Sequence, residues 1–261
     1  MAIRPFSVLL LLLFVVFPAA LPAGAVKPIV IGQKFASQEK QSMVSAPVGS
    51  PFPDEKIHKK WGDGFFITSA AYSSRGWNII LNQTSRWTNQ AYKLSRQWPN
   101  EWIQERKSEG YFVTSVASDG ESWLVVLSQG TDYKQQWEGT ETLSTITGYV
   151  RQCYELGYTV TSMAAKEGYW TFIMSVGESA KCEQKLLSSS SFSSMVEQVQ
   201  SWHDEGYILT ALDEDNGTYV YVVSRYKNKV AVPQDVFRVN DDIKDVIRNF
   251  WNSGYSVTIT D

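Results

Sequence analysis

Few residues of this chain could do chemistry, and their spacing matches no known catalytic set. The 261 residues include two histidines, His58 and His203, and two cysteines, Cys153 and Cys182. The sequence contains no His-x-x-x-His or Cys-x-x-Cys spacing and no Gly-x-Ser-x-Gly elbow. We therefore predict no metal site, no cofactor and no nucleophilic catalytic residue.

Carboxylates and hydroxyls offer weaker candidates. Asp213, Glu214 and Asp215 form the densest acidic cluster, but the sequence around them predicts a hairpin turn, which favours a solvated loop. A threonine also recurs at one place in a repeated pattern, at Thr68, Thr114, Thr161, Thr210 and Thr258. On strands facing a common axis these hydroxyls could bind a ligand. The alternative that we favour is hydrogen bonding between neighbouring strands.

Tryptophans supply the remaining candidates, because their large faces can stack on a ligand. Most of the ten tryptophans fall at matching repeat positions, such as Trp77, Trp123 and Trp170, which indicates packing between repeats. The tryptophans that fit the repeat less well are Trp87, Trp98 and Trp137. We expect these three to contact a ligand, with packing as an equal alternative.

A repeat of about 47 residues must position all of these side chains. A glycine followed by an aromatic-led strand occurs five times, with 46 to 49 residues between successive glycines, Gly64, Gly110, Gly157, Gly206 and Gly254. Start and stop signals predict helices near residues 54–60, 99–110, 145–155, 194–204 and 241–252. Second strands are predicted near 77–81, 123–128, 170–175 and 219–224, and a poorer third strand near 133–137. The sequence therefore predicts an α/β repeat protein of five helix–strand–strand–strand units.

The two ends of the chain complement each other. Residues 28–33 resemble a second strand, whereas residues 255–260 resemble a first strand with nothing after it. We predict that these segments pair, so that the N- and C-terminal pieces share one unit and close a propeller-like ring without open sheet edges. An open solenoid with atypical ends is the alternative.

The N-terminal sequence predicts secretion. Arg4, the apolar residues 8–17 and Ala23-Gly24-Ala25 match a cleavable signal peptide over residues 1–25, with an uncleaved anchor as the alternative. Residues 26–261 would then form a single five-repeat domain in the secretory pathway or outside the cell. In that oxidising compartment we expect a Cys153–Cys182 disulfide. Asn82 and Asn216 match the acceptor pattern for glycosylation.

Charge and apolar content exclude some partners. The net charge is −3 and no basic block with interleaved aromatic residues is present, so nucleic acid is not expected as a partner. No second long apolar run follows the signal, so we expect no membrane contact after its cleavage, and we expect a monomer.

The repeat resembles a region of known proteins. Residues 61–70, Trp-Gly-Asp-Gly-Phe-Phe-Ile-Thr-Ser-Ala, together with residues 110–117, 157–164 and 123–128, resemble the non-catalytic C-terminal region of plant casein kinase I-like protein kinases. The resemblance implies a shared scaffold and a plant-type origin. It implies no kinase activity, because the Gly-rich loop, His-Arg-Asp and Asp-Phe-Gly sequences are absent. That region has no assigned biochemical role.

These observations predict a binding protein of unknown ligand. We expect a secreted, ring-shaped binding or interaction module for a protein, glycan or small molecule. One alternative is an extracellular enzyme, a hydrolase or isomerase, with an active site on the axis. Another is a structural or storage protein.

Overall fold

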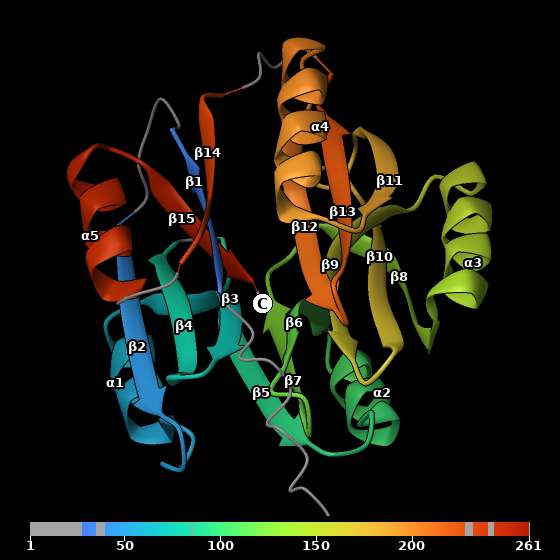
Figure 1. Cartoon of the computed structure of the whole chain (residues 1–261). Helices are drawn as coiled ribbons and strands as arrows, with labels where there is room; N and C mark the ends of the chain where they lie inside the picture. The colour runs from blue at the N-terminus through green and yellow to red at the C-terminus, as the bar shows by residue number, and fades with distance from the viewer. Residues whose placement is uncertain (1–27, 35–39, 85, 228–231, 240–242, 261) are drawn as a thin grey trace, which may run out of the picture.

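The computed structural model describes residues 28–34, 40–84, 86–227, 232–239 and 243–260 (Figure 1). The predicted signal peptide, residues 1–25, lies outside the described residues. The described chain is mixed α/β, with five helices and five three-stranded antiparallel sheets. The helices are α1 (Asp54–Gly62), α2 (Asn100–Ser108), α3 (Leu143–Glu155), α4 (Phe192–Asp204) and α5 (Ile243–Asn252). All five predicted helices are therefore confirmed.

Each helix belongs to a unit with three strands, and we number the units by their helices. Unit 1 contains β2 (Gln41–Pro47), β3 (Phe65–Ser73) and β4 (Gly76–Gln83), and unit 2 contains β5 (Asn89–Ser95), β6 (Phe112–Ser118) and β7 (Trp123–Gln129). Unit 3 contains β8 (Tyr133–Thr142), β9 (Thr159–Lys166) and β10 (Tyr169–Gly177), and unit 4 contains β11 (Glu183–Ser189), β12 (Ile208–Asp215) and β13 (Thr218–Arg225). Unit 5 contains β14 (Gln234–Arg238), β15 (Ser256–Thr260) and β1 (Ile29–Gln33).

The strand before each helix joins the sheet that follows it. In unit 2, for example, the strand order is β5-β7-β6, so β5 pairs with β7 and not with β4. The same arrangement holds in units 1, 3 and 4. The poorer third strand of each sequence repeat therefore belongs to the sheet of the next unit.

The two ends of the described chain meet in unit 5. There β1 lies between β14 and β15, with Ile29 opposite Thr260 and Gln33 opposite Ser256. The predicted pairing of residues 28–33 with residues 255–260 is therefore confirmed. The N-terminal strand supplies the middle position that β4 and β7 fill in units 1 and 2.

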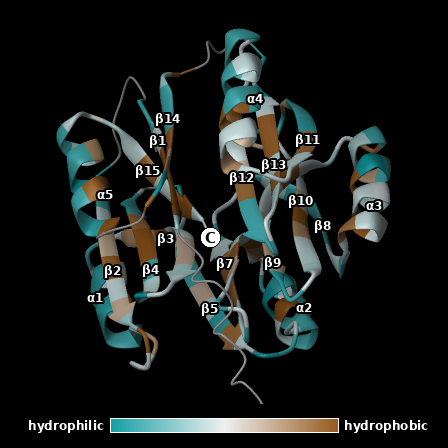
Figure 2. Ribbon diagram, in the orientation of Figure 1, coloured by the Kyte–Doolittle hydropathy of each residue, from teal (hydrophilic) through white to brown (hydrophobic). Residues whose placement is uncertain are grey.

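Five hydrophobic clusters form the core, and each contains residues of two units. Ala117 and Leu124 of unit 2 pack into the cluster of unit 1, and Ala164 and Ile173 of unit 3 pack into that of unit 2. Units 3 and 4, 4 and 5, and 5 and 1 share clusters in the same way. Figure 2 shows hydrophobic residues on the strands between the helices, while the outer helix surfaces are largely hydrophilic. Burial between neighbouring units therefore adds to the burial within each unit in stabilising the fold.

A repeated glutamine links the same pairs of units. Its side-chain amide donates to the carbonyl oxygen and accepts the N–H of one residue in the preceding unit, as Gln136 does with Val113 at 2.8 Å for both bonds. Gln41 binds Val257 in the same way and so links unit 1 to unit 5. The other pairs are Gln90–Ile67, Gln184–Val160 and Gln234–Leu209. Each bond pair satisfies polar backbone groups of a buried strand residue.

Candidate functional site

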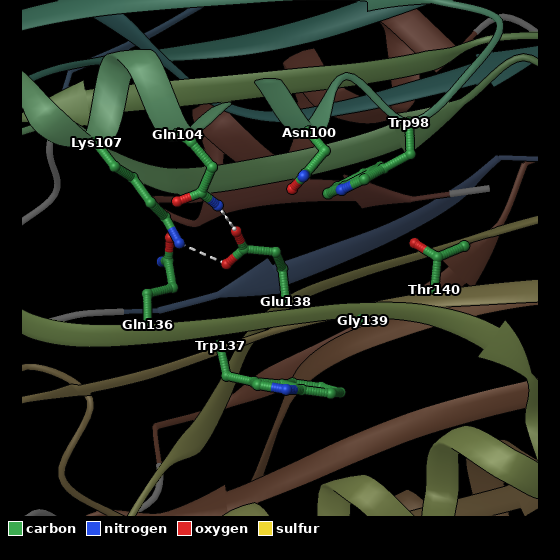
Figure 3. A pocket seen from close by; sticks show the side chains of 9 residues that line it. All are labelled: Trp98, Asn100, Gln104, Lys107, Gln136, Trp137, Glu138, Gly139 and Thr140. Carbon is green, nitrogen blue, oxygen red and sulfur yellow. Dashed lines mark hydrogen bonds and ion pairs between the residues drawn. The ribbon is translucent and has the colours of Figure 1, made fainter. Parts of the chain in front are cut away.

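A pocket of about 440 Å³ lies between α2 and β8, where units 2 and 3 meet (Figure 3). Nine residues line it, among them two of the predicted ligand contacts, Trp98 and Trp137. Successive side chains of a strand point to opposite faces, so Gln136, Glu138 and Thr140 face α2 together. The volume is within the range of small-molecule sites.

The centre of the pocket is a nearly buried charge pair. The Oε2 of Glu138 lies 2.5 Å from the Nζ of Lys107, and only 9% of the glutamate side chain and 18% of the lysine side chain are exposed. The Gln104 amide donates to the Oε1 of Glu138 at 3.1 Å. Figure 3 shows both α2 side chains reaching toward the carboxylate. Without these two partners a carboxylate this far from water would be costly.

Glu138 stands where every other unit has an apolar residue. It follows the repeated glutamine by two positions, and the residues at that position in units 1, 2, 4 and 5 are Met43, Tyr92, Leu186 and Val236. Each of these four packs against a hydrophobic cluster. The charge is therefore specific to unit 3, and a buried departure from a repeated packing solution points to function.

Lys107 is the matching departure on the helix. It lies three residues before the glycine that follows α2, where α1 and α5 carry Trp61 and Trp251. Those two indoles donate to the repeated glutamines, Trp61 to Gln90 at 3.1 Å and Trp251 to Gln41 at 2.8 Å. Lys107 donates to Glu138 instead. A charge pair that lines a pocket thus stands where α1 and α5 have an indole, whereas α3 and α4 carry Tyr154 and His203 at this helix position.

Trp98 combines packing with exposure to the pocket. Its ring meets Trp123 edge-on at 5.8 Å, as Phe52 meets Trp77 at 5.7 Å in unit 1. The residue therefore has the packing role that we gave as the alternative, and another part of its surface lines the pocket.

Trp137 has no aromatic counterpart in the other units. Its indole lies over Gly139 on the same strand and contacts the Tyr149 ring of α3, with centroids 6.2 Å apart. In Figure 3 it lies on the side of β8 opposite to Glu138. Trp87 is not part of this site, since it is absent from the pocket lining and packs edge-on against Phe66 at 6.3 Å.

The repeated threonines form no shared cluster of free hydroxyls. Each of the first four is the extra residue of a β-bulge in the strand after its helix. Thr114, for example, meets the Ser128 hydroxyl at 2.8 Å within its own sheet. Thr68, Thr161 and Thr210 are bonded likewise to Asn82, Ser175 and Ser224, while Thr258 lies in β15 without a bulge. These contacts fit the strand-bonding role.

The acidic cluster is not a solvated loop, contrary to our expectation. Asp213 to Asp215 end strand β12, and Asp213 is only 2% exposed. Its carboxylate accepts the N–H groups of Ala165 and Glu214, each at 2.7 Å. Burial raises the pKa of Asp213 well above its ordinary range. Through these two bonds to backbone groups, Asp213 joins β9 to β12. It is not among the residues that line the α2–β8 pocket.

The cysteines and histidines make packing contacts or hydrogen bonds and are not part of the pocket. Cys153 and Cys182 are both free, so the predicted disulfide is absent from the structure. Cys153 faces the core from α3, while the thiol of Cys182 donates to the Ala180 carbonyl at 3.4 Å. His58 packs against Trp61 at 5.0 Å, and a ring nitrogen of His203 lies 3.0 Å from the Val232 carbonyl oxygen.

The two glycosylation acceptors differ in accessibility. The Asn82 amide oxygen accepts hydrogen bonds from Gln41 and Thr68 within unit 1. Asn216 is exposed in the turn between β12 and β13. Among the described residues no group of His, Cys, Asp and Glu could hold a metal ion. No described helix has the length and apolar character needed to cross a bilayer.

A family model described as "Domain of unknown function (DUF7477)" matches residues 54–194. This is more than half of the chain. The chain belongs to the DUF7477 family. The match runs from α1 into α4 and contains every residue of the pocket, so the α2–β8 site lies within the family domain. No curated protein matches the chain. The resemblance to the kinase-associated region stays a prediction.

Proposed function

We propose that this protein is a secreted, non-catalytic binding module that holds a carbohydrate in the pocket between α2 and β8. The observation that carries the proposal is Glu138, a carboxylate placed where the other four units have a partly buried hydrophobic side chain. Two tryptophans, Trp98 and Trp137, line the same pocket as this carboxylate. The N-terminal sequence pattern supports secretion.

The polarity of the pocket favours a neutral, hydroxyl-rich ligand. The charges of Lys107 and Glu138 offset each other across 2.5 Å, so the pocket offers no excess charge to an ionic ligand. Asn100, Gln104 and Thr140 add amide and hydroxyl groups to the lining. Such groups exchange hydrogen bonds with sugar hydroxyls, while an indole covers the apolar face of a sugar ring.

The same lining argues against glycoside hydrolysis. Most glycosidases use two carboxylic residues on either side of the bond that they cleave. Among the nine residues that line the pocket, Glu138 is the only carboxylate, and Lys107 holds it as an ion pair. We therefore favour binding over catalysis at this site.

We also propose that the five units form a closed ring. The clusters and glutamine bonds that link each unit to the next also link unit 5 to unit 1. The N–H of Ile259 donates to the Ser69 hydroxyl at 3.2 Å, and the Thr260 hydroxyl donates to the Leu212 carbonyl. Strand β15 therefore contacts units 1 and 4 on its two sides, which supports closure over an open solenoid.

A glycan array followed by calorimetry tests the function. The variant Glu138→Leu installs the residue of unit 4, so we expect it to fold and to lose at least about tenfold in glycan affinity. Glu155→Leu makes the same change at an exposed position on α3 and should bind as wild type does. The proposal fails if no glycan binds, or if both variants bind like the wild type.

A further inference from the structure

We infer that the ligand is an oligosaccharide that continues from the pocket across the edge of β8 to the aromatic pair of Trp137 and Tyr149. This inference rests on the proposed function and adds a second subsite to it. The pocket would hold one part of the chain beside Glu138. The aromatic pair, on the other side of β8, would hold the next part.

The strand between the two places has an open edge. β8 is an edge strand, because it pairs with β10 on one side and the sheet ends there. Its residue at the crossing is Gly139, which has no side chain of its own, and the indole of Trp137 lies over it. At the equivalent position units 1, 2, 4 and 5 have Val44, Lys93, Leu187 and Phe237. Among the five units, only unit 3 therefore has glycine at this position of its edge strand.

Tyr149 gives the aromatic pair a surface that a sugar can reach, whereas Trp137 is partly buried and packs against the cluster shared by units 3 and 4. Tyr149 is 45% exposed on α3, and its ring is tilted by 52° to that of Trp137. Two rings at this angle form a shallow angled platform and not a closed stack. The residues equivalent to Trp137 in the other units are Ser42, Ala91, Lys185 and Asp235, so the platform too occurs only beside the pocket.

Two departures from the repeat thus lie on the two faces of one strand. All five residues line the pocket: Gln136, Glu138 and Thr140 from the face toward α2, and Trp137 and Gly139 from the opposite face, where Trp137 also meets Tyr149. Because residues of a strand alternate between its faces, a single segment of β8 builds both subsites. We expect a monosaccharide beside Glu138 not to reach Tyr149, whereas a chain that crosses the edge would reach it.

Calorimetry with ligands of different length tests the second subsite. The probes are β-1,4-linked glucose, xylose and N-acetylglucosamine, each as the monomer, the dimer and the hexamer. We expect one series to bind with affinity that rises with length. Tyr149→Ala should weaken the hexamer by about tenfold and leave the monomer unchanged. Tyr149→Phe keeps the ring and should bind the hexamer like wild type.

The matched control is Tyr169→Ala, which removes a tyrosine that is 52% exposed on β10 and should change neither affinity. If hexamer and monomer bind equally, or if Tyr149→Ala has no effect on either, the second subsite is wrong. Loss of binding in Glu138→Leu would then still support the pocket. If no sugar of any series binds, both the second subsite and the proposed function are overturned.

Discussion

The indole of Trp137 lies across the backbone of Gly139, two residues along the same strand. A Cβ atom on Gly139 would fall 2.4 Å from the Cη2 atom of that ring, closer than non-bonded atoms approach. The ring can therefore keep its position only while residue 139 is glycine. The orientation of the Trp137 ring at the edge of the pocket thus depends on glycine at position 139.

Gly139→Ala should displace Trp137 and cost stability. We expect the free energy of unfolding to fall by about 1–3 kcal/mol, as for other overpacked sites. Urea denaturation measures this change. Gly148→Ala is the control, because an added Cβ there meets no atom within 4 Å. This exposed position is inside α3, so the control should raise stability by about 0.5–1 kcal/mol. Equal effects of the two substitutions on the free energy of unfolding would show that the Trp137 ring does not depend on glycine at position 139.

Lys107 and Glu138 should behave as a replacement for an apolar pair. Lys107→Met leaves the Glu138 carboxylate nearly buried without its cation, and we expect a loss of about 1–3 kcal/mol in the free energy of unfolding. The double variant K107W/E138M copies Trp251 of unit 5 and Met43 of unit 1. It should recover to within about 1 kcal/mol of wild type, because an apolar pair can replace a buried ion pair.

Urea denaturation of Lys107→Met and of the double variant separates these effects. The double variant should still lose sugar binding, since Glu138 is gone. If the double variant were as unstable as Lys107→Met, Lys107 and Glu138 would not be equivalent to Trp251 of unit 5 and Met43 of unit 1.

The buried Asp213 should make stability depend on pH. Its pKa is raised by burial, so the folded chain binds this proton more tightly than the unfolded chain does. Protonated Asp213 therefore stabilises the fold at low pH, and this contribution is lost as the pH rises through the raised pKa. Wild type should lose stability relative to Asp213→Asn as the pH rises from the ordinary pKa of an aspartic acid, about 4, toward the raised pKa of the folded chain.

Thermal unfolding of wild type and Asp213→Asn across that pH range measures the difference in their stability. The other carboxylates contribute equally to both proteins and cancel from this difference. A difference that is flat with pH would show that folding does not raise the pKa of Asp213.

Both cysteines should be reduced thiols in the folded protein. Burial raises the pKa of Cys153 and of Cys182, so each forms thiolate only at a higher pH than an exposed cysteine. Alkylation with iodoacetamide at pH 7 should be slow in the folded chain. In denaturant without reductant it should add two groups, as measured by intact mass. Addition of none would mean that the two are joined as the sequence had predicted.

The repeat made much of the fold predictable. The five helices and the strand pair β1–β15 follow from glycine spacing and apolar periodicity, which are local properties of a chain. The repeated glutamine was also visible, at Gln41, Gln90, Gln136, Gln184 and Gln234, but its bonds to the preceding unit were not foreseen. Polar residues before a predicted helix look like loop residues until their partners are known.

The sequence by itself determined the repeated unit, the order of its elements and the complementarity of the two ends. Only the tertiary structure decided which sheet each strand before a helix joins, since β5 pairs with β7 across a helix. It also brought Lys107, Trp98 and Glu138 around one pocket and placed Asp213 in the interior. The physical reason is that period and turn chemistry act between neighbours in the chain. Burial, ion pairing and cavities depend on residues that packing between units brings together.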